Sequence, residues 1–198
     1  MITVLDFETA NADRGSICSV GVAVIRNGVM LRPREVLIKP HCSCGGFSPF
    51  NIRIHGITPE MVRNAPEWGE FFPKLLPYLD GSTVVAHNAV FDISVLRRGL
   101  ELYGLEVPRF EFFCTCKAAK RLWPEFDNHK LNTLAARFGH SFRHHNAAED
   151  AEAAAVVLHA MFRETGTSDC RELGEKLGIT PGIAGPDVFV PVKVKKSC

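Results

Sequence analysis

The sequence predicts an α/β protein whose mixed five-stranded sheet is flanked by α-helices. Three strand-like segments that include a hairpin signal come first, helices and strands then alternate, and the following segments have a helical period. A hairpin joins antiparallel strands, whereas a helix between two strands joins parallel ones. This order of segments therefore implies strands of both directions in one sheet, covered by helices.

The first three strands are expected near the N-terminus. Residues 2–7 are almost all apolar, which is typical of a central strand that is covered on both faces. Residues 16–26 and 29–39 are two further β-rich segments. The Asn27-Gly28 pair between them favours a two-residue hairpin turn.

The segment after the third strand is expected to change from loop to helix. Residues 40–57 contain Gly, Pro and Ser and predict a long loop. Thr58 followed by Pro59 is an N-cap signal for a short helix. Apolar residues then recur at helical spacing over 66–79, where an Asp-Gly pair ends the pattern.

Strands and helices alternate through the middle of the chain. Residues 83–86 predict a short buried strand, 89–103 have one apolar helical face, and 109–114 supply the fifth strand. Three more helices are expected at about 115–122, 130–138 and 148–164. We place the main domain at residues 1–165. Residues 166–198 are expected to be a short helical segment and a Gly/Pro/Lys-containing tail that is extended or flexible.

The composition is that of an ordinary soluble protein. Of 198 residues, 46% are hydrophobic and 23% are charged, and the net charge of +1 allows only a local grip on nucleic acid. The N-terminus lacks the pattern of a signal peptide, and no apolar run reaches the roughly 20 residues that span a bilayer. We therefore expect a cytoplasmic protein with no membrane partner and reduced thiols at its seven cysteines.

Two closely spaced cysteine pairs, in residues 41–44 and 114–116, suggest zinc as one interpretation. Structural zinc sites normally space their cysteines by two to four residues, so Cys-x-Cys is tight for one ion. Cys114 is expected at the end of a strand, where a buried thiol is a small hydrophobic group. We favour this second interpretation.

Two carboxylates, Asp6 and Glu8, end the first strand. Side chains at positions i and i+2 of a strand lie on one face, with Cα atoms roughly 6.5 Å apart. Two acids beside a buried strand repel each other unless a cation lies between them, and Mg²⁺ or Mn²⁺ prefers such oxygen ligands. The alternative is a strand end that is simply exposed to solvent.

Further acids follow at two helix starts. Asp92 lies directly after the strand at 83–86, where open α/β sheets build their sites, although the helix dipole alone also favours an acid there. Asp150 opens the last long helix, together with Glu149 and Glu152. Spacing alone does not choose among these three.

Three motifs together resemble the DEDD superfamily of 3′-5′ exonucleases. They are DFET at residues 6–9, HNAVFD at 87–92 and HNAAED at 145–150, in the order of the family. The segment HGIT at 55–58 also resembles family members. A histidine five residues before the last aspartate indicates the DEDDh branch, which includes the proofreading epsilon subunit of DNA polymerase III; Asn146 stands where the DEDDy branch has tyrosine. The resemblance covers residues 1–165 and implies a ribonuclease-H-like sheet.

The resemblance implies a role for each motif residue. His145 would be the general base that takes the proton of the attacking water, a role that suits a group with a pKa near neutrality. Its neighbour His144 is expected to be a bystander, with a phosphate or carbonyl contact as the alternative. The cofactors would be two Mg²⁺ or Mn²⁺ ions. The implied metal ligands are Asp6, Glu8, Asp92 and Asp150.

Substrate contacts are expected on either side of these acids. Thr9 and Ala10, through their backbone amides, and His87 with Asn88 would hold the nucleic acid end. Phe91 would either stack on the substrate or pack as a core aromatic at the helix base, and we favour packing. Candidates for phosphate contact are Arg53, Arg97, Arg98 and Arg143, although solvated helix faces explain Arg97 and Arg98 equally well.

The predicted function is 3′-5′ exonuclease cleavage of single-stranded DNA, or of RNA, in proofreading or in repair and end trimming. The alternative enzyme is an RNA exonuclease similar to oligoribonuclease or RNase T. An alternative of another class is a binding subunit that contacts a DNA polymerase subunit through the tail after Gly166.

Overall fold

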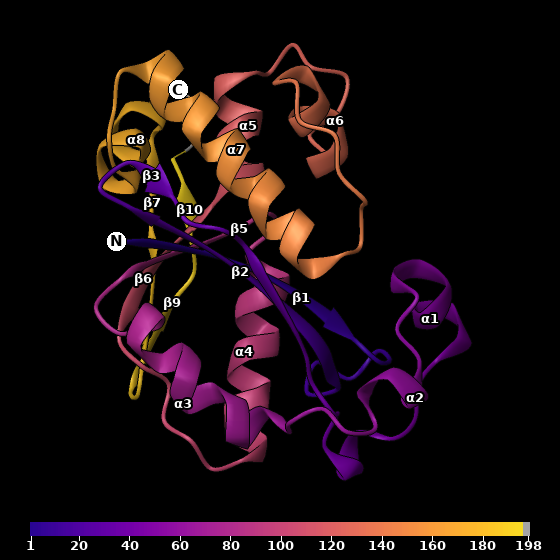
Figure 1. The fold of residues 1–198 in the computed structure, drawn as a ribbon. Coiled ribbons are helices and arrows are strands. Elements are labelled where there is room, and N and C mark those ends of the chain that lie inside the picture. Colours follow the sequence, from indigo (N-terminus) through magenta and orange to yellow (C-terminus); the bar gives the residue numbers. More distant parts are fainter. Residues whose placement is uncertain (196–198) are drawn as a thin grey trace.

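The computed structural model describes residues 1–195, and its centre is a mixed sheet (Figure 1). The central strand β1 (Ile2–Thr9) is antiparallel to β2 (Ile17–Arg26) and parallel to β5 (Thr83–Ala86), which is followed by parallel β6 (Phe110–Cys114). Over these residues the strand order is β3-β2-β1-β5-β6-β8-β9, and β4 also pairs with β2. The outer strands are β3 (Val29–Met30), β4 (Arg34–Leu37), β8 (Gly182–Gly185) and β9 (Val188–Val190).

The mixed α/β architecture predicted from the sequence is confirmed. The expected third strand is divided into β3 and β4, because the chain leaves the ladder around Pro33, which has no N–H to donate. All five expected strand regions otherwise lie in the sheet. The sheet is wider than predicted because β8 and β9 extend it beyond β6.

Helices cover both faces of the sheet. Figure 1 shows α7 (Ala147–Thr165) with α5 (Thr115–Leu122) and α6 (Leu131–Arg137) on one side, and α3 (Trp68–Leu79) with α4 (Val90–Leu102) on the other. Neighbouring side chains of β1 point to opposite faces, so Phe7 packs against Trp68 of α3 at 5.6 Å between ring centroids. The adjacent acids Asp6 and Glu8 therefore face α7.

The segment expected as a long loop contains two helical turns. They are a 3-10 helix at Cys42–Cys44 and α1 (Pro49–His55), and α2 (Pro59–Val62) follows at the predicted N-cap. Ser48 caps α1 by accepting from the Phe50 amide, and Gly56 ends it in the left-handed conformation. The Ser-Pro pair was therefore a helix start that the surrounding glycines and prolines concealed.

The C-terminal tail is more ordered than predicted. The expected helical segment is α8 (Cys170–Leu177), but the residues after it form strands. Strand β8 pairs with β6, and Phe189 of β9 stacks on Phe112 at 5.8 Å. Two short strands, β7 (Ile179–Thr180) and β10 (Lys193–Val194), pair separately. Of the two expected states, extended or flexible, the segments Ile179–Thr180, Gly182–Gly185, Val188–Val190 and Lys193–Val194 take the extended one as strands. Residues 196–198 lie outside the described residues.

Among residues 1–195, none of the helices combines the length and the apolar character that a membrane-spanning segment requires. The six cysteines that fall among residues 1–195 are all free thiols.

A glycine allows α7 to start close to the sheet. A Cβ atom on Gly21 of β2 would lie 1.7 Å from the carbonyl oxygen of Ala147, the first residue of α7. This close approach brings the N-terminal end of α7 to the face of β1 that carries Asp6 and Glu8. The absence of one side chain therefore positions the last acidic motif.

We predict that Gly21→Ala destabilises the protein. The added methyl group must push α7 away, and such overpacking costs about 1–3 kcal/mol or more. Thermal unfolding followed by circular dichroism measures the change. Gly46→Ala is the matched control, because a Cβ there meets nothing within 4 Å. Equal melting temperatures for the two variants would contradict the close-packing argument.

Candidate active site

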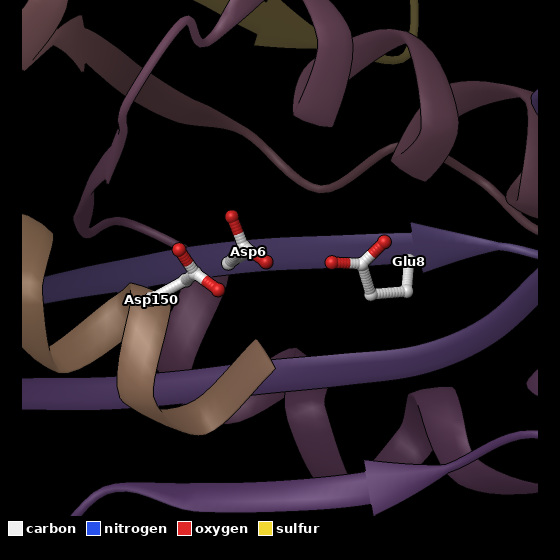
Figure 2. A group of neighbouring side chains, drawn as sticks. All are labelled: Asp6, Glu8 and Asp150. Atoms are coloured by element: carbon white, nitrogen blue, oxygen red, sulfur yellow. The ribbon is translucent and has the colours of Figure 1, made fainter. Parts of the chain in front are cut away.

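Three carboxylates from two elements meet at the end of β1. Figure 2 shows Asp6 and Glu8 on β1, with Asp150 reaching toward them from the first turn of α7. One oxygen from each lies within 4.8 Å of the others, and no other such group of three or more His, Cys, Asp or Glu was found among residues 1–195. Residues 144 positions apart in sequence are thereby brought to one point.

The structure selects Asp150 from the three acids at the start of α7. Asp150 is buried, and its Oδ2 accepts from the His145 amide at 2.6 Å. Glu149 instead points back along the chain and accepts from the Arg143 amide. Asp150 is therefore the acid that completes the group with Asp6 and Glu8.

Asp92 lies next to this group rather than in it. It is buried in the first turn of α4, and its Oδ1 accepts from the Phe7 amide at 3.2 Å. Its negative charge is among the causes that raise the pKa of Asp6. The role of Asp92 as a metal ligand, which the resemblance implies, therefore remains a prediction.

The acidic group is electrostatically unfavourable without a cation. Burial raises the pKa of Asp6 well above its ordinary value, and the charges of Asp92, Asp150 and Glu8 raise it further. Burial, with the neighbouring acids, raises the pKa of Glu8 to about 8, and burial raises that of Asp92 to about 8. Oxygen donors that repel one another in a buried site are what a divalent cation neutralises, so these residues fit such an ion.

Two stacked histidines border the acids. His145 adopts a left-handed backbone conformation (φ 68°), and its Nδ1 lies 3.5 Å from Glu8 Oε1. Burial, followed by the charge of His144, lowers the pKa of His145, so the ring is neutral and can accept a proton at neutral pH. His144 was expected to be a bystander, but its Nδ1 lies 2.6 Å from Asp150 Oδ1, because the ring stacks on His145 at 4.0 Å.

In the second motif, HNAVFD, His87 is hydrogen-bonded within the protein and Asn88 is exposed. His87 donates from Nε2 to the His129 carbonyl at 2.9 Å, and its Nδ1 lies 3.0 Å from the Thr115 hydroxyl. Burial lowers its pKa to about 4, so the ring is neutral and already bonded on both sides. Asn88, exposed and in the left-handed conformation (φ 68°), faces the cleft beside the acids. Of the two, Asn88 is the one that is free to meet a substrate.

Thr9 and Ala10 are anchored within the protein. The Thr9 carbonyl accepts from Asn51 Nδ2 at 2.8 Å and contacts His55 Nε2 at 3.2 Å, which ties α1 to the end of β1. The Ala10 amide already donates to the Ser16 carbonyl at 2.7 Å. Substrate contact at Thr9 and Ala10 remains a prediction, and it would require the Ala10 amide to exchange this bond.

The aromatic and arginine candidates divide by location. Phe91 is half-buried at the base of α4, and the Arg14 guanidinium lies 4.2 Å over its ring. Arg97 stacks over Phe189, and Arg98 pairs with Glu101 at 2.7 Å, so both serve the protein's own surface. The two remaining candidates, Arg53 and Arg143, are exposed.

A cleft of about 410 Å³ opens beside the acidic group. Sequence reasoning missed most of its wall, which comes from α5 and from the segment that precedes α6. No motif marks these positions, so no sequence signal could have found them. The lining residues are Asp6, His87, Asn88, Cys116, Lys120, His129, Lys130, Leu131, His144 and Asp150.

A mixed sheet with buried acids at the end of its central strand, a histidine and an open cleft defines a hydrolase of the metal-dependent phosphodiesterase class. The family model described as "Exonuclease" (RNase_T) matches residues 3–158, and the chain belongs to this family. The membership confirms the resemblance found in the three motifs. It also confirms that the chain is an exonuclease, in a family that generally uses divalent metal ions.

Related sequences include DNA polymerases. The chain is 31% identical over 164 residues to "DNA polymerase III PolC-type" of Bacillus cereus, a match that covers 81% of this chain and 11% of that polymerase. The enzyme of the same name from Thermotoga petrophila is 33% identical over 181 residues, which is 89% of this chain and 12% of that protein. The chain thus spans about a tenth of the length of these relatives.

Solved structures agree with the fold. "Exonuclease X in complex with 5' overhanging duplex DNA" has a TM-score of 0.69 and 27% identity, and the match covers 85% of this chain and 95% of that one. The nuclease domain of 3'hExo, described as a DEDDh family member bound to rAMP, has a TM-score of 0.69 over 82% of this chain and 92% of its own. At 18% identity, that second likeness supports the fold alone.

We predict that the metal-free protein loses stability as pH rises from about 6.5 to about 8. The unfolded acids have lost their protons above about pH 4, whereas folded Glu8 and Asp92 keep theirs up to about pH 8. Over this pH range the folded state binds more protons than the unfolded state, so the free energy of unfolding decreases as the pH rises. The histidines with lowered pKa values, such as His87, oppose this only below about pH 6.5.

Melting temperatures in EDTA across this pH range test the prediction, and a fall of several degrees is expected. Asp92→Asn, which keeps an oxygen for the Phe7 amide, should reduce the slope, and Mg²⁺ or Mn²⁺ should flatten it. A melting temperature that stays level or rises in EDTA would show that these acids are not held protonated.

Proposed function

We propose that the chain removes nucleotides from the 3′ ends of single-stranded DNA. One observation carries this proposal: Asp6, Glu8 and Asp150 converge within 4.8 Å, with His145 Nδ1 at 3.5 Å from Glu8. DNA is favoured over RNA because Exonuclease X, at 27% identity, is bound to DNA, whereas the neighbour bound to rAMP is only 18% identical. RNA ends are the second substrate to be tested.

The acids would hold two Mg²⁺ or Mn²⁺ ions, with Asp6, Glu8 and Asp150 as the central ligands and Asp92 beside them. When bound, such ions neutralise the acids, stabilise the charge of the reacting phosphate and make water easier to deprotonate. The carboxylates would exclude other anions until the ions are present, so that phosphate binding follows cation binding. Asp150 would also fix the catalytic loop, because its Oδ2 accepts from the His145 amide.

His145 would accept the proton of the attacking water. Its neutral ring has the free electron pair that the step requires, and its partial exposure lets it reach the reacting phosphate. The left-handed backbone at this residue turns the side chain toward Glu8 rather than away from the acids. His144, on the other face of the stack, would hold Asp150 in place through Nδ1.

The biological setting we propose is cytoplasmic proofreading or repair of DNA ends. The PolC-type relatives favour a polymerase subunit as partner. We place the catalytic domain at residues 1–165 and treat 166–198 as an appendage; its strands β8 and β9 are already used in the sheet. A polymerase would therefore meet the outer face of these strands rather than a free tail.

Degradation of labelled oligonucleotides tests the proposed function. With Mg²⁺ or Mn²⁺, a 5′-labelled single strand should give a ladder of shortening products, and a 3′-labelled strand should release labelled mononucleotide at once. EDTA should stop both reactions, and Asp150→Asn is the inactive control. Activity that persists in EDTA would overturn the metal requirement, and initial loss of a 5′ label would overturn the polarity.

We predict that replacing His145 lowers turnover by about 10²–10⁴-fold and leaves the fold intact, because a positioned base contributes that much. His145→Asn is the better variant, since asparagine tolerates the left-handed backbone, whereas alanine there adds about 1–2 kcal/mol of strain. Single-turnover rates and thermal melts measure the two effects.

The control for this prediction is His159→Asn, which lies in α7 about three turns after its first residue, Ala147. It should keep full activity. Near-normal turnover in His145→Asn would remove this residue from the mechanism.

A further inference from the structure

The cleft beside the acids is also lined by basic residues. Asp6 and Asp150 line it together with Lys120 of α5 and Lys130, which precedes α6. Both lysines are exposed, and among residues 1–195 neither has a carboxylate within 4.0 Å of its ammonium group. Two cations without a carboxylate partner thus line the same cleft of about 410 Å³ as Asp6 and Asp150.

Neighbouring basic residues of α5 are engaged elsewhere. Lys117 Nζ donates to the Val192 carbonyl at 2.6 Å, and Arg121 donates to the Lys195 carbonyl, so both hold the C-terminal strands. Lys120 lies between them in sequence but on the cleft side of the helix. Helix α5 therefore carries two basic residues that bind the C-terminal segment and one, Lys120, that lines the cleft.

The wall that carries Lys130 is rigid. His129 donates from Nε2 to the Trp123 carbonyl at 2.8 Å, and its own carbonyl accepts from His87. Trp123 stacks on Phe126 with ring centroids 5.5 Å apart, and the Arg137 guanidinium lies 4.2 Å over the Phe126 ring. These contacts hold the backbone of the segment between α5 and α6, so Lys130 extends from a well-anchored segment and Lys120 from a helix.

We propose that this cleft is the channel for the nucleic acid strand on the 5′ side of the bond to be cleaved. Lys120 and Lys130 each hold one backbone phosphate, and Asn88 lies where the strand leaves the acids. Backbone phosphates bind lysines without regard to base sequence. The preferred substrate is then a chain of several nucleotides, and a mononucleotide ester or a dinucleotide misses these contacts.

This inference rests on the proposed exonuclease function, and its test separates the two. The double variant Lys120→Ala/Lys130→Ala is compared with the unchanged chain on octathymidylate, on dithymidylate and on the p-nitrophenyl ester of thymidine 5′-monophosphate. The ester has a scissile phosphate but no further phosphate. Lys74→Ala/Lys193→Ala, which removes two exposed lysines elsewhere, is the matched control.

The double variant should raise KM for octathymidylate by at least tenfold and leave kcat unchanged. It should also lower the slope of log(kcat/KM) against log salt by about 1.4, the value for two lost phosphate contacts on a single strand. Hydrolysis of the p-nitrophenyl ester should not change. An unchanged KM for the octamer, or an equal loss on the ester, would overturn the channel.

Binding provides a readout that does not depend on catalysis. Fluorescence anisotropy of 5′-labelled octathymidylate, with Mg²⁺ and the His145→Asn variant as background, should show at least tenfold weaker binding when both lysines are replaced. If the unchanged chain cleaves no substrate, the proposed function fails, while this difference in affinity still supports the channel. Equal affinities would exclude it.

Discussion

Mutual repulsion among buried carboxylates is the constraint on which the rest of this structure depends. Asp6 and Glu8 lie at the end of a strand whose other residues are buried, and Asp150 is brought to them across the sheet. Burial raises the pKa values of all three acids, and the neighbouring carboxylates raise those of Asp6 and Glu8 further, so the folded chain keeps an unfavourable group that packing alone would not select. The fold therefore places these three carboxylates where they fit a divalent cation, and their repulsion lowers the stability of the folded chain at a site suited to chemistry.

The start of α7 is held from several directions at once. Gly21 lets the helix approach β2, while Asn146 caps the helix and donates to Glu35 of β4 at 2.9 Å. Glu35 in turn accepts from Ser19 at 2.8 Å. These contacts hold the left-handed turn at His145, so the histidine proposed as the base is positioned by the edge of the sheet as well as by the helix that follows it.

Sequence reasoning found the fold and the acids because both depend on local patterns. The hairpin, the apolar first strand and the helix starts predict a mixed sheet, and three motifs identified Asp6, Glu8, Asp92 and Asp150. Tertiary contacts could not be predicted from the sequence. The role of His144 depends on its stacking against His145, the strand β8 depends on a free edge of β6, and the orientation of Lys120 depends on which face of α5 meets the cleft. Spacing along the chain encodes none of these.

Opposite charges within the cleft relate metal binding to substrate binding. Acids without cations repel phosphate, whereas the lysines that line the same cleft attract it, so a strand that arrives before the cations would bind the lysines without reaching the acids. Once cations neutralise the acids, the whole cleft favours phosphate and a continuous path from the lysines to Asp6 becomes possible. Because the segment between α5 and α6 is fixed by His87 and His129, that path does not depend on a loop closing over the substrate. We therefore expect the order of binding, rather than a moving lid, to control access to the acids.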